Sequence, residues 1–137
     1  MGTIALRQAL ETQQVRMIAL PSLLLVTGAV LIGIYLGILY LKGVRPKRIL
    51  LGGHILMGIG GVEQTALLIH GTPSGAMETA TFLKAAAGLF AFAIFTGLTA
   101  PLIAQSKGRQ NGEIMLATHA AVGIVGFALF VAWIAKM

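Results

Sequence analysis

Long apolar stretches separated by short polar segments run through the whole chain. Residues 17–41, 85–106 and 114–135 carry no charged side chain, and residues 49–70 carry only Glu63. A helix needs about 20 apolar residues to cross a bilayer, and its backbone polar groups must be satisfied within the segment. The pattern therefore predicts one all-α membrane domain, 1–137, with transmembrane helices at about 18–42, 48–71, 80–105 and 113–135.

The segments between these helices are short and contain Gly, Pro or Asn. They cover residues 42–47, 71–79 and 105–112, and this composition is typical of turns. Short connections favour antiparallel neighbours, so we expect an up-down-up-down four-helix bundle. Residues 1–16 mix polar and apolar side chains and predict an interfacial N-terminal segment, with Pro21 marking the entry to the first spanning helix.

Composition supports this interpretation and excludes other classes of protein. Hydrophobic residues make up 57% of the chain and charged residues 10%, against about 25% charged residues in an ordinary soluble domain. The absence of Cys excludes disulfides and thiolate chemistry. The net charge of +6 does not indicate nucleic-acid binding, because the cations lie singly or in short runs between apolar blocks. The expected surroundings are a lipid bilayer.

Basic residues are distributed unevenly between the two ends of the predicted bundle. The first and third connections hold the larger set, and the opposite end holds Arg7, Arg16, Lys84 and Lys136. The larger set consists of Lys42, Arg45, Lys47, Arg48, Lys107 and Arg109. Because short cytoplasmic loops carry the excess of Lys and Arg, we expect these connections in the cytoplasm of a bacterial cell and both termini outside.

The second and fourth predicted helices share a pattern centred on a histidine. Aligned on His54 and His119, both read I-[LM]-L-small-[GT]-H-x-x-x-G-I-x-G, with an offset of 65 residues. The first and third helices match more loosely, with an offset of 60 residues that aligns Gly28, Gly33 and Gly37 with Gly88, Ala93 and Gly97. The sequence therefore predicts two repeated helical hairpins.

The two histidines are expected at the same depth in the membrane. Each lies six residues, or about 9 Å, into its predicted helix, and the second and fourth helices of an up-down bundle run in the same direction. The glycines four and seven positions after each histidine share its helix face; they are Gly58, Gly61, Gly123 and Gly126.

Two opposed imidazoles beside bare backbone suit one haem b, with His54 and His119 as axial ligands of its iron. The neighbouring basic residues are expected to meet the haem propionates at the membrane interface; they are Lys47, Arg48, Lys107 and Arg109. Two alternatives stay open. In the first alternative, the two histidines have a structural role and form hydrogen bonds between helices. In the second alternative, they ligate another metal or a chlorophyll-type ring.

This arrangement resembles the transmembrane cytochromes b with a four-helix core, the ascorbate-reducible type and its bacterial relatives. The resemblance rests on His54, His119 and their glycines, and it implies axial histidines on alternate core helices. That family commonly binds two haems with four histidines, whereas this chain has three. His70 has no partner at matching depth on the fourth helix, so one haem is expected.

A second polar group lies in the middle of the second predicted helix. Glu63 is nine residues from His54, on the opposite side of the helix, and shares a face with His70 seven residues later. An intramembrane carboxylate is costly and often functional, so Glu63 and His70 are candidates for a proton path or a quinone contact. The alternative is a structural role, with Glu63 protonated or paired with Lys84 or another subunit.

These patterns favour a membrane electron-transfer subunit over an enzyme acting alone. A haem with two histidine ligands has no open coordination site, so it would exchange electrons with quinone or with a partner subunit of a membrane redox complex. Two other functions stay open: a cofactor-free accessory subunit of a respiratory or photosynthetic complex, and a small proton-coupled transporter using Glu63. The repeat disfavours the transporter, because Ala128 occupies the position equivalent to Glu63.

Overall fold

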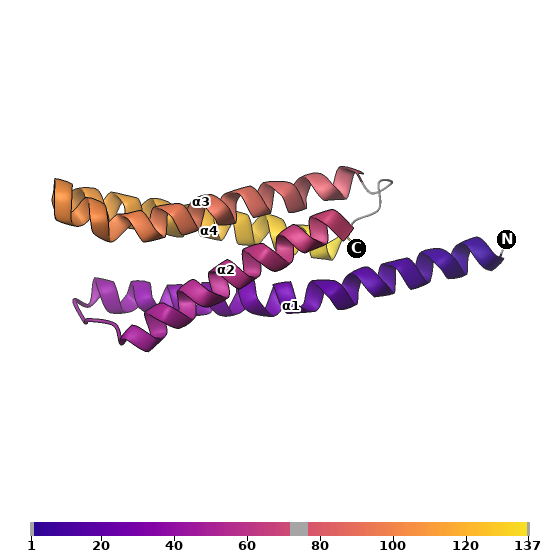
Figure 1. Ribbon diagram of the computed structural model, residues 1–137, viewed down its shortest axis with the longest axis horizontal. Coiled ribbons are helices and arrows are strands. Elements are labelled where there is room, and N and C mark those ends of the chain that lie inside the picture. Colours follow the sequence, from indigo (N-terminus) through magenta and orange to yellow (C-terminus); the bar gives the residue numbers. More distant parts are fainter. Residues whose placement is uncertain (1, 72–76, 137) are drawn as a thin grey trace.

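The computed structural model describes residues 2–71 and 77–136, and all regular structure in them is helical. The elements are α1 (Gly2–Leu41), α2 (Arg48–Gly71), α3 (Met77–Lys107) and α4 (Arg109–Ala135) (Figure 1). The predicted all-α class with four helices is confirmed. The helices alternate in direction. The α1–α2 and α3–α4 connections lie at one end of the molecule, and the last residues of α2 and the first residues of α3 lie at the other end.

Three of the described helices contain segments long and apolar enough to cross a membrane. These segments are Ala19–Leu41, Ala80–Lys107 and Arg109–Ala135. The helix α2 is not among them, because His54, the adjacent Glu63 and Gln64, and His70 interrupt its apolar sequence. Insertion of the protein into a membrane is thus supported by three of the four predicted spans.

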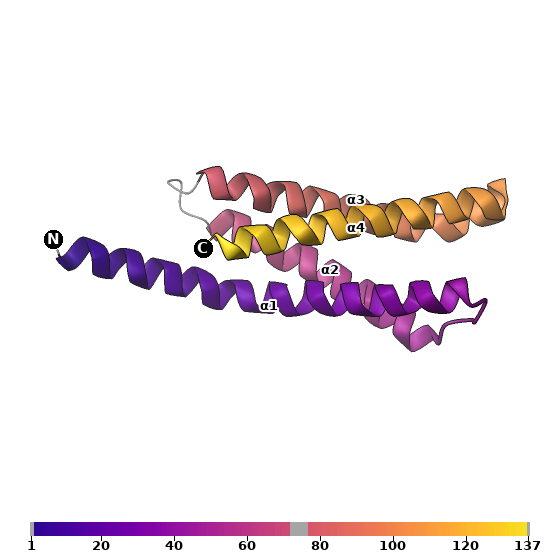
Figure 2. The same cartoon turned by 180° about the vertical axis from the view of Figure 1, so that it is seen from behind.

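The first helix is longer than the sequence predicts. Residues 2–41 form one continuous helix that carries Pro21 in its interior, and its N-terminal part extends beyond the ends of the other helices (Figures 1 and 2). Pro21, predicted to mark the entry to the first spanning helix, lies two residues inside the apolar segment Ala19–Leu41, and the helix continues through it toward the N-terminus. The interfacial location of residues 1–16 stays a prediction. Proline removes one backbone donor but keeps a helical φ, and buried contacts of Ala19 and Ser22 on either side hold this stretch against the bundle.

The α1–α2 connection matches its predicted bounds. Gly43 follows α1 with a φ of 68°, a conformation that glycine adopts at low cost. The amide of Val44 donates to the Leu39 carbonyl at 2.9 Å, and that of Gly43 donates to the Tyr40 carbonyl at 3.0 Å. These two bonds form the Schellman arrangement that ends a helix. For the second connection, α2 ends at Gly71 and α3 begins at Met77, and residues 72–76 lie outside the described residues.

The α3–α4 connection is much shorter than the predicted 105–112. Only Gly108 separates the two helices, and its φ of 91° reverses the chain within one residue. The side-chain amide of Asn111 donates to the Lys107 carbonyl at 2.6 Å and satisfies the end of α3. Gly112 packs so closely on Ala104 that a side chain there would collide with it. The missing side chain therefore lets α4 begin directly against α3.

The two hairpins bury equivalent positions. A buried residue of α1 corresponds to a buried residue of α3 at an offset of 64, and the buried residues of α2 and α4 correspond at 65. The buried pairs are Ala19 with Leu83, Ser22 with Ala86, Val26 with Phe90, Ala29 with Ala93, Gly61 with Gly126, Thr65 with Phe130, and Leu68 with Trp133. Between the buried positions of α1 and α3 the offset is 64 residues, whereas the predicted alignment of these two helices uses an offset of 60.

Packing is closest within each hairpin and looser between them. A Cβ at Gly61 would lie 2.8 Å from the Val26 side chain, and a Cβ at Gly126 would lie 3.0 Å from the Phe90 ring. Small residues at such positions let helix backbones approach each other. In the described part of the chain, α2 and α4 have no Cα atoms within 8 Å of each other, so these two helices lie diagonally across the bundle.

The first hairpin also contains a buried polar contact. The hydroxyls of Ser22 and Thr65 lie 3.0 Å apart, and the hydroxyl of Thr65 donates to the Gly61 carbonyl at 2.7 Å.

We expect Ser22→Ala to lower the free energy of unfolding by about 1 kcal/mol, because Thr65 keeps its hydrogen bond to the Gly61 carbonyl. Thermal unfolding in detergent measures this loss. Ser106→Ala is the control, since exposed Ser106 donates to the Leu102 carbonyl of its own helix. An equal loss in both variants would contradict the prediction.

Candidate functional site

The two helices that lie diagonally across the bundle bring His54 and His119 together. The imidazole centroids are 5.8 Å apart, and the ring planes are inclined at 83°. Both side chains are half-buried. Because the backbones of α2 and α4 stay apart, the two rings meet in the space between the hairpins. The two histidines of the predicted repeat are therefore neighbours in space.

Each imidazole is anchored to the other helix of its own hairpin. His54 Nδ1 lies 2.9 Å from the Ala29 carbonyl oxygen of α1, and His119 Nδ1 lies 2.7 Å from the Ala93 carbonyl oxygen of α3. A carbonyl oxygen only accepts hydrogen bonds, so Nδ1 carries the proton and donates in both cases. In a neutral imidazole, this leaves Nε2 with a free lone pair. Both histidines thus present the same nitrogen for binding a metal.

A glycine four residues after each acceptor makes room for the ring. A Cβ at Gly33 would lie 2.9 Å from His54 Cε1, and one at Gly97 would lie 2.8 Å from His119 Nδ1. Real side chains do not tolerate such distances, so these positions need glycine as long as the rings stay in place. The role of both glycines was not predicted from the sequence, because the predicted repeat aligns Gly33 with Ala93. The signal was an Ala-x-x-x-Gly pattern repeated after 64 residues.

The four glycines predicted to line the site fall into two kinds. A Cβ at Gly58 or Gly123, one turn after each histidine, would have nothing within 4 Å. These positions leave open space beside the helix backbone, as a flat ligand requires. Gly61 and Gly126 instead pack against Val26 and Phe90 within their hairpins. Helix packing accounts for these last two glycines, and their contact with a ligand stays a prediction.

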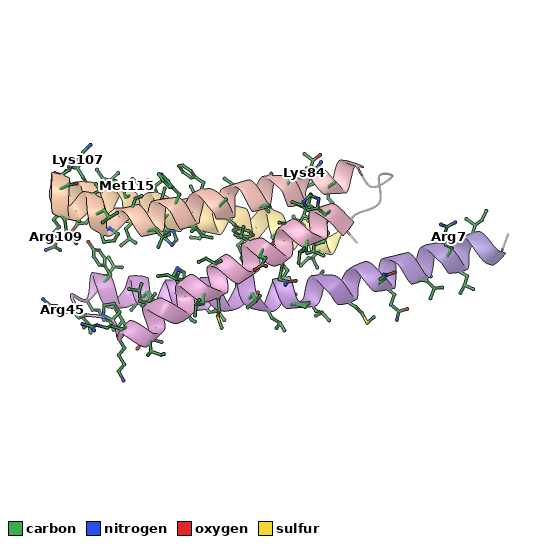
Figure 3. The ribbon with its side chains drawn as sticks, viewed as in Figure 1. Arg7, Arg45, Lys84, Lys107, Arg109 and Met115 are labelled. Carbon is green, nitrogen blue, oxygen red and sulfur yellow. The ribbon has the colours of Figure 1, made fainter. Side chains whose placement is uncertain are left out.

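The predicted basic residues gather at the end of the bundle that carries the α1–α2 and α3–α4 connections. Lys47 and Arg48 are exposed there, seven and six residues before His54, and Arg45, Lys107 and Arg109 lie at the same end (Figure 3). The structure gives no contact between Lys47 or Arg48 and either imidazole among the described residues. These cations can reach a ligand only if it extends from the histidines to this end.

A polar cluster links the two hairpins at the same end. Glu113 of α4 accepts hydrogen bonds from Arg109 Nε at 2.7 Å and from the Tyr40 hydroxyl of α1 at 3.0 Å. The bond from Tyr40 crosses from one hairpin to the other. It holds together the ends of α1 and α4, which are otherwise in sparse contact. This cluster was not predicted from the sequence, because Tyr40 and Glu113 are far apart along the chain.

Glu63 and His70 do not belong to the histidine pair. Both are exposed on the outer face of α2, whereas His54 on the same helix points between the hairpins. Within the described residues, no hydrogen bond or ion pair joins Glu63 to His70 or to Lys84. The alternative of an intrachain pair between Glu63 and Lys84 is therefore not seen. Glu63 faces the surroundings of the protein.

The donor set fits a macrocycle better than a bare metal ion. Among the described residues, no three His, Asp or Glu side chains are grouped so that they could hold a metal. A porphyrin supplies four nitrogens itself and needs only axial ligands. With metal–imidazole bonds of about 2 Å, two rings on opposite sides of one metal have centroids about 6 Å apart. The observed 5.8 Å agrees with this spacing.

Comparison with known protein families, with characterised proteins and with solved structures finds no match for this chain.

Proposed function

We propose that the chain is a membrane electron-transfer subunit that carries one haem b between His54 and His119. The observation that carries this proposal is the pair of rings at 5.8 Å, each with Nδ1 bonded to a backbone carbonyl. Metal-bound histidines in proteins usually donate their second N–H in this way, which fixes the tautomer and orients the ring. The resemblance to transmembrane cytochromes b is consistent with this assignment.

The residues of the chain would have distinct roles around the haem. His54 and His119 would hold the iron through Nε2, and Ala29 and Ala93 would orient them through their carbonyls. Open backbone at Gly58 and Gly123 would leave room for the macrocycle. The basic residues at the end of the bundle, Lys47 and Arg48 among them, would attract the propionates. The bound haem would supply one-electron redox chemistry.

The same contacts support a membrane bundle of four helices, including the more polar α2. Thr65 meets Ser22, Gly61 meets Val26, and His54 bonds to Ala29. These contacts align α2 with the apolar segment Ala19–Leu41 of α1, so α2 would cross the same layer. The matching buried positions and histidine anchors of the two hairpins support two copies of one ancestral unit. The basic end would lie in the cytoplasm of a bacterial cell, with the termini outside.

Electron exchange would involve a partner from outside the chain. His54 and His119 would both be used to hold the haem, and the bound group would supply electron transfer to a partner instead of a binding position for a substrate. A quinone in the bilayer, or a redox subunit docked at either end of the bundle, would serve as donor or acceptor. The subunit would then be part of a larger oxidoreductase complex.

The absorption spectrum of the protein, purified in detergent from cells that make haem, tests this proposal. We expect a low-spin b-type spectrum on reduction, and a pyridine haemochrome assay giving one haem b per chain. A folded but colourless protein would contradict the proposal and support a cofactor-free accessory subunit. A spectrum of a chlorophyll-type ring would contradict the choice of haem while keeping the two histidines as ligands.

A further inference from the structure

Two oppositely charged side chains point out of the bundle on adjacent helices. Glu63 of α2 and Lys84 of α3 are both exposed, and Lys84 lies on the outer side of α3 (Figure 3). In the part of the chain that the structure describes, neither side chain forms a hydrogen bond or an ion pair. Both charges are thus available to a molecule outside this chain.

The two charges lie at similar depth. Glu63 comes eight residues before α2 ends at Gly71, and Lys84 comes seven residues after α3 begins at Met77. At 1.5 Å per residue, both are about 10 to 12 Å from the helix ends that meet at this side of the bundle. Lys84 lies four residues inside the apolar segment Ala80–Lys107. In the four-helix membrane bundle proposed above, on which this step rests, both charges fall within the apolar part of the bundle.

Charges at this depth are costly when they face lipid. Ionisable side chains inside membranes normally face the bundle interior or pair with an opposite charge. Here both face outward, and apolar side chains surround Glu63: Leu56 is 73% exposed and Leu67 is 54% exposed. A partner that covers this surface must therefore provide a cation opposite Glu63 and an anion opposite Lys84.

We propose that the α2–α3 face binds a second copy of this chain, with Glu63 of each copy paired with Lys84 of the other. A two-fold axis along the membrane normal places the same surface on both sides of the interface. A surface with one anion and one cation at similar depth is complementary to itself under this symmetry, and it forms two ion pairs per dimer. Gly88, one turn after Lys84, has open space around it and allows close approach of helices.

Cross-linking tests the geometry of this interface, because the chain contains no Cys. Two differently tagged forms, Glu63→Cys and Lys84→Cys, are produced together in one membrane and oxidised. We expect a disulfide between the two tags, while the second ion pair of the same dimer stays intact. The control combines Glu63→Cys with Ile124→Cys, which is also exposed, on α4, and is expected not to cross-link. Cross-linking in the control alone, or in neither combination, overturns the proposal.

Charge reversal tests the pairing itself. Glu63→Lys and Lys84→Glu each place like charges opposite each other in a low-dielectric layer, and we expect each to weaken dimerisation at least about tenfold. The double variant with both reversals restores the pairs and the dimer. Energy transfer between labelled copies in lipid vesicles, diluted with lipid, measures the dimer fraction. A double variant as dissociated as the single variants, or a monomeric natural chain, overturns the proposal. Neither readout depends on haem.

Discussion

Alanine at either His54 or His119 is expected to remove the low-spin b-type spectrum completely. Each ring would supply one of two axial bonds to the iron, and no other described His, Asp or Glu side chain groups with them to replace it. Haem bound by the remaining histidine would be high-spin and weakly held. The measurement is the reduced-minus-oxidised spectrum of each variant, together with the haem content per chain.

His70→Ala provides the matched control for these variants. His70 is exposed at the end of α2 and distant in sequence from the imidazole pair, so its loss is expected to leave the spectrum unchanged. Circular dichroism shows whether each variant keeps its helices. Smaller His54→Gly and His119→Gly variants are expected to regain a low-spin spectrum when imidazole is added. A helical His54→Ala or His119→Ala protein with an unchanged spectrum would refute the haem ligation.

The sequence alone was sufficient for the parts of the structure that depend on local patterns. Apolar stretches of membrane-spanning length placed all four helices, and the bounds of α2 agree with the predicted 48–71. The repeated pattern around His54 and His119 identified two residues that the fold brings within 5.8 Å. Both predictions agree with the structure because helix periodicity and short connections determine which residues share a helix face and which lie at the same level of the bundle.

The remaining features depend on contacts between helices, which local patterns do not contain. The residues at 105–112 have turn composition, yet packing of Gly112 on Ala104 keeps almost all of them helical. Pro21 is compatible with a helix end or a helix interior, and its buried neighbours select the interior. Gly61 and Gly58 look equivalent in sequence. Only the position of α1 shows that Gly61 packs against Val26, whereas Gly58 has open space beside it.

Replacing the two glycines that support the imidazoles is expected to weaken haem binding about 10- to 100-fold, the usual effect of disturbing the groups that orient a metal ligand. In Gly33→Ala, the new methyl group would lie 2.9 Å from His54 Cε1, and in Gly97→Ala it would lie 2.8 Å from His119 Nδ1. The ring must move in each case and lose its bond to the carbonyl of Ala29 or Ala93. Haem titration followed by absorbance gives the affinities.

Two other glycines separate this effect from general effects on the helices. Gly37→Ala in α1 and Gly88→Ala in α3 add a methyl group where nothing lies within 4 Å, and we expect both to bind haem like the natural chain. Alanine also favours a helix over glycine by about 1 kcal/mol, so weaker helices cannot explain a loss at Gly33 or Gly97. Equal affinities in all four variants would show that the imidazoles are free to reorient, and would remove the backbone carbonyls from the proposed site.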